Sequence, residues 1–174
     1  MIWRVLARLL AWPPFEQLII WYAKRRPFLH LGGYMHRYWC MPRCLLHRIN
    51  GALEPFYAVL PFTIRVHHIL RADADPYLHD HPWNWRTVIL RGWYEEEDVF
   101  GTRWVRMAGD TRKASAETFH RITRVSSGGV WTLFIMGRWR NRWGFMVGDP
   151  PRKVYYRDYR SKNGRGELTH GTSI

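Results

Sequence analysis

The sequence predicts an all-β sandwich or barrel that is preceded by a helical extension. From residue 56 onward, short segments of alternating apolar and polar residues recur at near-regular spacing, separated by turn-forming residues. The first 26 residues instead have helical periodicity. With 174 residues, of which 47% are hydrophobic, the chain can bury one sizeable core. We therefore expect an N-terminal helical extension over 1–55, a barrel over 56–150 and a C-terminal strand with a polar tail over 151–174.

Two amphipathic helices are predicted in the extension. The first, over 2–12, gathers four apolar residues near one face: Ile2, Leu6, Leu9 and Leu10. Pro13-Pro14 ends it and can open a second helix over 15–25, whose apolar stripe consists of Phe15, Leu18, Ile19 and Tyr22. The simplest expectation is that both helices pack on the barrel. The alternative is that these basic amphipathic helices contact a membrane surface or a partner.

The strands of the barrel are predicted at 64–70, 78–81, 87–93, 99–107, 119–125 and 130–136. In the first strand, alternation places Val66 and His68 toward the core, and Arg65 and His67 toward solvent. We therefore expect His68 to be a hydrogen-bonded core or pocket residue. The acidic run at 95–98 is predicted to form a solvated turn, and contacts with arginine or a metal are the alternative.

Three histidines form the candidate site. His79 and His81 are one residue apart, so on a strand both imidazoles project from the same face. His120 follows after 38 intervening residues, within a stretch of further strands that a barrel could bring back to the same point. Three neutral imidazoles that converge in a partly apolar pocket make a transition-metal site. The alternative is that the three are core or surface polar residues. In either case Asp80, which lies between His79 and His81, is expected to point to the opposite face.

These residues resemble the two motifs of the cupin superfamily. The first motif runs Gly, five residues, His-x-His, three or four residues, Glu, six residues, Gly, and its positions are held here by Asp73, His79, His81, Trp85 and Gly92. In the second motif Gly109 and His120 match, while the Pro, Gly and Asn positions are held by Ser115, Glu117 and Arg124. The resemblance covers about residues 60–148 and implies a double-stranded β-helix (jelly-roll) barrel.

The resemblance also implies a metal site with three histidines, since Trp85 stands where many cupins have a glutamate ligand. The segment 141–145 is similar to cysteine-dioxygenase-type cupins of bacteria and phages. An Fe(II)-dependent oxygenase with His79, His81 and His120 as ligands is therefore the leading expectation, with Zn, Ni or Mn as other metals. Its substrate is expected to be a small anion, because neutral ligands leave the metal's full charge in place.

Around this site, Trp85, Tyr94 and arginines whose identity the sequence leaves open are expected to shape and charge the pocket. Two other functions remain open at this stage. One is a non-catalytic cupin that binds a metal or another ligand. The other is an isomerase acting on sugar nucleotides, which needs a base such as His68 and no metal.

The charge of the chain predicts contacts with polyanions. The formal net charge is +13, and nearly all the cations are arginines. Arg138, Arg140 and Arg142 alternate with aromatic residues in the manner of surfaces that bind single-stranded nucleic acid. The alternative is a structural cluster in which arginine and tryptophan side chains stack on one another.

Composition also predicts where the protein works. The two cysteines, Cys40 and Cys44, argue against a disulfide-stapled secreted domain. No segment has the roughly 18 uninterrupted apolar residues of a membrane span, and no signal peptide is recognisable. We therefore expect a cytoplasmic protein, for which a homodimer is one possible oligomeric state.

Overall fold

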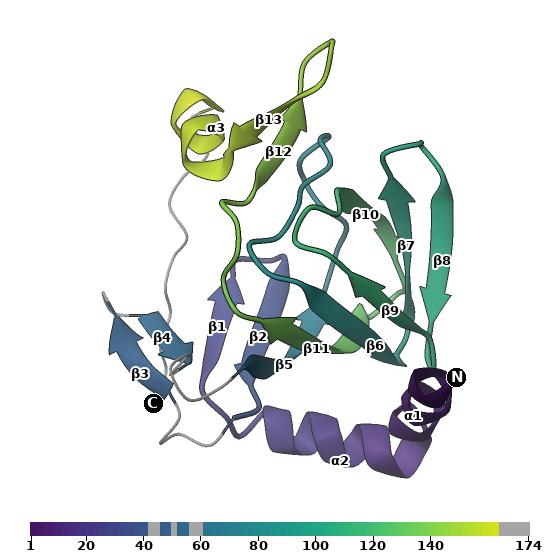
Figure 1. Cartoon of the computed structure of the whole chain (residues 1–174). Coiled ribbons are helices and arrows are strands. Elements are labelled where there is room, and N and C mark those ends of the chain that lie inside the picture. The colour runs from purple at the N-terminus through teal and green to yellow at the C-terminus, as the bar shows by residue number, and fades with distance from the viewer. Residues whose placement is uncertain (42–45, 50–51, 56–60, 164–174) are drawn as a thin grey trace.

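The computed structural model describes residues 1–41, 46–49, 52–55 and 61–163. Antiparallel strands are the main secondary structure of these residues, and two N-terminal helices lie outside the larger sheet (Figure 1). This arrangement confirms the predicted all-β jelly-roll fold with N-terminal helices. No helix in the described part of the chain is both long and apolar enough to cross a membrane.

The larger sheet has six strands in the order β1-β2-β5-β11-β6-β9. Their bounds, in chain order, are β1 (Phe28–Leu31), β2 (Met35–Trp39), β5 (Phe62–Ile69), β6 (Trp85–Arg91), β9 (Thr111–Ala114) and β11 (Val130–Gly137). All neighbouring strands in this sheet are antiparallel. The central strand β11 pairs with β5 on one side and with β6 on the other, so residues far apart in the sequence line one sheet.

The opposite sheet contains β10-β7-β8, with bounds His120–Val125, Trp93–Asp98 and Arg103–Met107. His79 bridges this sheet to the hairpin of β12 (Gly144–Val147) and β13 (Arg152–Tyr155), because it pairs with both His120 and Phe145. The predicted strand 78–81 is therefore present only as this short bridge. A separate pair is formed by β3 (Leu46–Ile49) and β4 (Ala52–Pro55).

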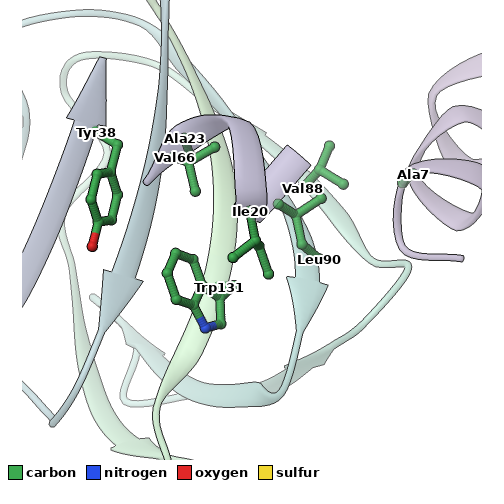
Figure 2. Close-up of a cluster of buried hydrophobic side chains, with 8 residues drawn as sticks. All are labelled: Ala7, Ile20, Ala23, Tyr38, Val66, Val88, Leu90 and Trp131. Atoms are coloured by element: carbon green, nitrogen blue, oxygen red, sulfur yellow. The ribbon is translucent and has the colours of Figure 1, made fainter. Parts of the chain in front are cut away.

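The helices α1 (Ile2–Leu10) and α2 (Pro13–Ala23) pack against the outer face of the larger sheet. Figure 2 shows the cluster between them, in which the small side chains Ala7 and Ala23 and the larger Ile20 meet sheet residues; those are Tyr38, Val66, Val88, Leu90 and Trp131. Glu16 of α2 is buried and accepts hydrogen bonds from Arg91 of β6 at 2.6 and 3.1 Å. This ion pair fixes α2 to the sheet.

The N-terminal region differs from the predicted helical extension over 1–55. Its second helix ends at Ala23, and β1 and β2 then join the main sheet, with β2 paired to β5. The strands were missed because their apolar and polar residues do not alternate regularly. The C-terminal strand β13 lies within the region predicted to hold it and is followed by α3 (Tyr156–Asn163), which was not predicted. The rest of the predicted polar tail lies outside the described residues.

The two faces of β5 are the reverse of the prediction. Val66 packs toward the helices, and His68 stacks on Trp131 with ring centroids 4.1 Å apart. Arg65 and His67 instead line the space between the two sheets. Alternation correctly separated the two faces, but both faces of this sheet are covered, so polarity does not reveal which one is interior.

Candidate metal centre

A small cavity lies between the two sheets. Its volume is about 90 Å³, and its walls are formed by β2, β5, β6 and β11 on one side and by β7, β10 and the 79–81 segment on the other. Buried apolar clusters close the space around it, one containing Ile69, Ile89 and Ile122 and another containing Trp39, Trp85 and Met136. The cavity therefore lies within the packed core between the two sheets.

The structure brings His79, His81 and His120 together on the wall of this cavity. One ring nitrogen from each lies within 4.8 Å of the other two. The Nε2 atoms of His81 and His120 are 2.9 Å apart. Backbone pairing explains the meeting: the amide of His79 donates to the carbonyl of His120 at 2.9 Å, and the reverse bond is 3.0 Å long. The local His-x-His spacing and one long-range pairing thus assemble the cluster.

Glu96 lies directly behind His120. Its Oε1 atom is 2.6 Å from Nδ1 of His120, and its side chain is fully buried. Arg112 also contacts Oε1, and Nε of Arg106 lies 3.3 Å from Oε2. Two guanidinium groups thus stabilise the carboxylate, and the carboxylate contacts His120 at Nδ1. Such an outer partner fixes the orientation of a ligating imidazole and leaves Nε2 facing the site.

Glu96 overturns the prediction that the acidic run forms a solvated turn. The run lies in β7, where Glu96 is buried and paired with arginines. One signal in the sequence could have indicated this: on a strand, Glu96 shares a face with Tyr94, which is also buried.

Carboxylates also support the 79–81 segment. Asp73 Oδ2 lies 3.8 Å from Nδ1 of His79 and accepts a hydrogen bond of 2.7 Å from the amide of Ile122. Asp80 is fully buried on the opposite side from the two histidines, as its position between them predicts. It accepts a hydrogen bond of 2.7 Å from the amide of Gly144 and pairs with Lys153. Asp80 therefore fastens the segment to β12 and β13.

Burial keeps the three imidazoles neutral near pH 7. Burial lowers the pKa of His79 to about 4, and Asp73 opposes that shift. Burial, assisted by Arg112, lowers the pKa of His120 to about 4. The pKa of His81 falls well below its ordinary value for the same reason, with a further contribution from His120. Neutral imidazoles have the free lone pairs that metal coordination requires.

The other predicted pocket residues divide into two groups. Trp85 and Tyr94 line the cavity, and the Trp85 ring stacks on Phe134 with centroids 5.4 Å apart. His68 does not line it, because it lies on the helix-facing side of β5 and its Nε2 is 2.9 Å from the carbonyl oxygen of Gly128. Its predicted place in the pocket was wrong, since the inward face of β5 was assigned the wrong way round.

Two arginines face the cavity, and the sequence had left their identity open. Arg37 on β2 and Arg65 on β5 both line it, together with His67. The Arg65 guanidinium stacks on Trp39 at 3.7 Å. Burial lowers the pKa of Arg37 and also that of His67, which Arg37 and Arg65 depress further. Among the described residues that line the cavity there is no carboxylate, so its walls favour an anion.

Arg138, Arg140 and Arg142 lie outside the cavity. They are exposed on the segment between β11 and β12, and Arg142 lies over Tyr155 at 5.6 Å. The amide of Arg140 donates to the carbonyl oxygen of Pro82 at 2.6 Å, which holds this segment next to the 79–81 segment. The three side chains are accessible to a polyanion, and their role in binding nucleic acid stays a prediction.

No protein-family profile and no curated protein matches this sequence. Among solved structures, the chain is similar to a cupin-like protein of Thermotoga maritima, with 13% identity over 77% of this chain and 86% of that one, at a TM-score of 0.45. It is similar to hydroxypropylphosphonic acid epoxidase of S. wedmorenis, with 14% identity, 67% coverage of this chain and a TM-score of 0.46. The match spans 56% of the epoxidase. A Streptomyces protein, PAC13, solved with uridine, has 9% identity over 77% of this chain and 88% of that one, at a TM-score of 0.47.

Proposed function

We propose that this protein is a metal-binding cupin that holds a divalent transition metal on His79, His81 and His120. We further propose that it is an Fe(II)-dependent oxygenase of the cysteine-dioxygenase type, acting on a small anionic substrate. The observation that carries the proposal is the convergence of three imidazoles, one buried and two partly buried, on a cavity whose charged lining groups are arginines.

The donor set fits a transition-metal ion. The Nε2 atoms of His81 and His120 point at one another across 2.9 Å, and burial keeps both rings largely neutral. Two neutral nitrogens at that distance need a proton or a cation between them. Metal-bound nitrogens lie about 2.1 Å from the ion, so two nitrogens about 3 Å apart can share one. Zn, Ni and Mn are accepted by the same ligands, and Fe(II) is preferred because three neutral ligands on one face suit an oxygenase.

Arg37 and Arg65 supply the recognition of the substrate. Their guanidinium groups suit bidentate contacts with a carboxylate or phosphate. A metal bound by three neutral imidazoles keeps its double positive charge, so both the metal and the two arginines would attract an anion. The volume of about 90 Å³ restricts the substrate to a small molecule. When bound, Fe(II) supplies the activation of O₂.

The remaining residues of the site orient His120 and form the walls of the cavity. Glu96 holds the Nδ1 side of His120, so that its Nε2 faces the cavity. Trp85 and Phe134 form an apolar wall that excludes water from the reacting groups. His67 is a neutral buried ring next to Phe134, with centroids 4.9 Å apart, and it limits the width of the cavity.

A non-catalytic protein that binds a metal and an anion is the second candidate. It is favoured by the absence of a carboxylate general base among the described residues that line the cavity. The isomerase alternative loses its proposed base, since His68 lies on the outer face of the sheet.

Metal analysis tests the site. Protein purified without chelator should retain stoichiometric metal, and His79→Ala and His120→Ala should each lose it while the circular dichroism spectrum is unchanged. The matched control is His68→Ala, which removes a histidine from the other face of β5 and should retain metal. Stoichiometric metal in His79→Ala or His120→Ala would show that the proposed ligand is wrong.

Oxygen uptake tests the activity. The metal-free protein is reconstituted anaerobically with Fe(II) and then given O₂ with a panel of small thiols, carboxylates and phosphates. Uptake that depends on one anionic compound, and that is reduced at least about tenfold in Arg37→Gln, supports the oxygenase. Arg138→Gln, which removes an exposed arginine outside the cavity, should behave like the wild type. Iron that stays bound without uptake across the panel would favour the binding protein.

A further inference from the structure

The two N-terminal helices have an outer surface that the described residues leave uncovered. This N-terminal apolar face consists of the exposed residues Ile2, Val5, Leu6, Leu9, Trp12, Phe15, Leu18, Trp21 and Tyr22. Leu18 is 58% exposed and Ile2 is 69% exposed. The predicted apolar stripes thus point largely outward, whereas the sequence favoured their packing on the barrel. A concentration of nine exposed large apolar residues on and between two short helices marks an interaction site.

The outward direction of this face is fixed by how α2 is anchored. Glu16, Ile20 and Ala23 all face the sheet, where Glu16 pairs with Arg91. One residue advances a helix by about 100°, so Leu18 and Trp21 lie on the side opposite to these three. Turning the helix to bury them would break the Glu16–Arg91 pair and move Ile20 from the core toward water. The exposure of the face is therefore built into the packing.

The same is true of α1. Ala7 is its fully buried residue and meets the sheet through a small side chain. Val5 and Leu9 lie well away from Ala7 around the helix and are 62% and 49% exposed. The helix thus packs through Ala7 and Leu10 and keeps Val5 and Leu9 outside.

The exposed charged residues among the first 26 all have one sign. Arg4, Arg8, Lys24 and Arg25 are exposed. The single acidic residue among the first 26 is Glu16, which is buried and paired. Any partner that covers the apolar residues must therefore also accept four or more cations.

We propose that the N-terminal apolar face binds the surface of an anionic lipid bilayer. Helices that lie at a bilayer surface combine an apolar face containing tryptophan with flanking arginine and lysine, because the rings enter the headgroup region and the cations meet lipid phosphates. Trp12, Trp21 and Tyr22 provide such rings here. A second copy of the chain is a poorer partner, since pairing two such faces would bring like charges together. The helices α1 and α2 are 9 and 11 residues long, too short to cross a bilayer.

Co-sedimentation of the full chain with vesicles tests the proposal. The protein should pellet with vesicles of phosphatidylcholine and phosphatidylglycerol (about 7:3) and remain mostly in the supernatant with phosphatidylcholine alone. The double variant with Leu9→Asp and Leu18→Asp should bind the anionic vesicles at least about tenfold more weakly. Its matched control combines Val99→Asp and Phe100→Asp, which adds the same charge at exposed apolar residues near the turn between β7 and β8, away from α1 and α2 (Figure 1).

A second variant separates charge from apolar contact. Replacing Arg4, Arg8, Lys24 and Arg25 by glutamine should reduce binding to anionic vesicles at least about tenfold, and 0.5 M salt should weaken the wild type similarly. Circular dichroism verifies that each variant is folded. Three outcomes would overturn the proposal: wild-type protein that stays in the supernatant, equal binding to both kinds of vesicle, or a dimer by light scattering that Leu9→Asp with Leu18→Asp dissociates.

Discussion

The carboxylate of Glu96 lies 2.6 Å from Nδ1 of His120, on the side of the imidazole away from His81. Glu96 is in turn held by Arg106 and Arg112. The negative charge of this group therefore lies behind the histidine cluster, and the charged residues that face the cavity are arginines. This separation places three imidazoles and two arginines at the cavity and keeps the carboxylate behind His120.

Replacing Glu96 by glutamine should weaken metal binding by about 10- to 100-fold, because His120 loses the charged partner that orients it. The measurement is a titration with Zn²⁺ or Fe(II) in competition with a chelator. The control is Glu97→Gln, a neighbour on β7 whose carboxylate pairs with Arg121 instead, at 2.9 Å. Equal metal affinity in Glu96→Gln and the wild type would contradict the orienting role.

Without metal, the protein should lose stability as the pH falls from about 6.5 to about 4. Burial lowers the pKa of both His79 and His120 from 6.5 to about 4. Between these values the unfolded chain binds protons and the folded chain does not, so the stabilisation is complete above pH 6.5 and is lost on acidification. The loss is at most about 3 kcal/mol for each histidine.

Urea unfolding of chelator-treated protein at several pH values measures this effect. A variant with His79→Gln and His120→Gln should show a flatter dependence of stability on pH over the same range, because it lacks the two imidazoles with lowered pKa. The carboxylates and other histidines titrate in both proteins and do not contribute to the difference. Parallel curves for the two proteins would rule out protonation of this pair as the cause.

Gly92→Ala should destabilise the protein far more than Gly101→Ala. Both glycines have a positive φ, +79° and +73°. A Cβ at Gly92 would lie 2.5 Å from Oγ of Ser126, whereas nothing lies within 4 Å of one at Gly101. Strain alone should lower the free energy of unfolding by about 1–2 kcal/mol at Gly101, and the steric conflict should add to this at Gly92. Urea unfolding compares the two, and equal losses would contradict the close approach.

Binding of single-stranded oligonucleotides should depend on Arg138, Arg140 and Arg142 if these exposed residues contact phosphates. Replacing all three by glutamine should reduce the slope of log affinity against log salt by up to about 2, because each phosphate contact contributes about 0.7. The control removes three other exposed cations, Lys113, Arg152 and Arg157. An equal change in both triple variants would mean that the binding reflects only net charge.

Several features of the fold and site followed from local sequence. Turn residues and alternation predicted short antiparallel strands, and the spacing of His79 and His81 placed both imidazoles on one side of the segment, with Asp80 on the other. The motif spacing selected His120 as their companion, and the three rings do meet. The directions of His79, Asp80 and His81 could be predicted because side-chain direction along an extended segment depends only on neighbouring residues. His120 joins them through its long-range pairing with His79.

What the tertiary structure alone decided was which side of each strand became the interior. Helices α1 and α2 cover the outer face of the sheet, so Val66 is buried there and His67 faces the cavity, the reverse of the expected order. Glu96 and Arg37 reached the site from strands whose sequences resemble ordinary surface. Polarity marks an interior only where one face of a sheet meets water, and this sheet has a helical layer on one side and, on the other, a cavity that also admits arginine and histidine side chains. Pairing between distant strands therefore determined the charged surroundings of the histidines.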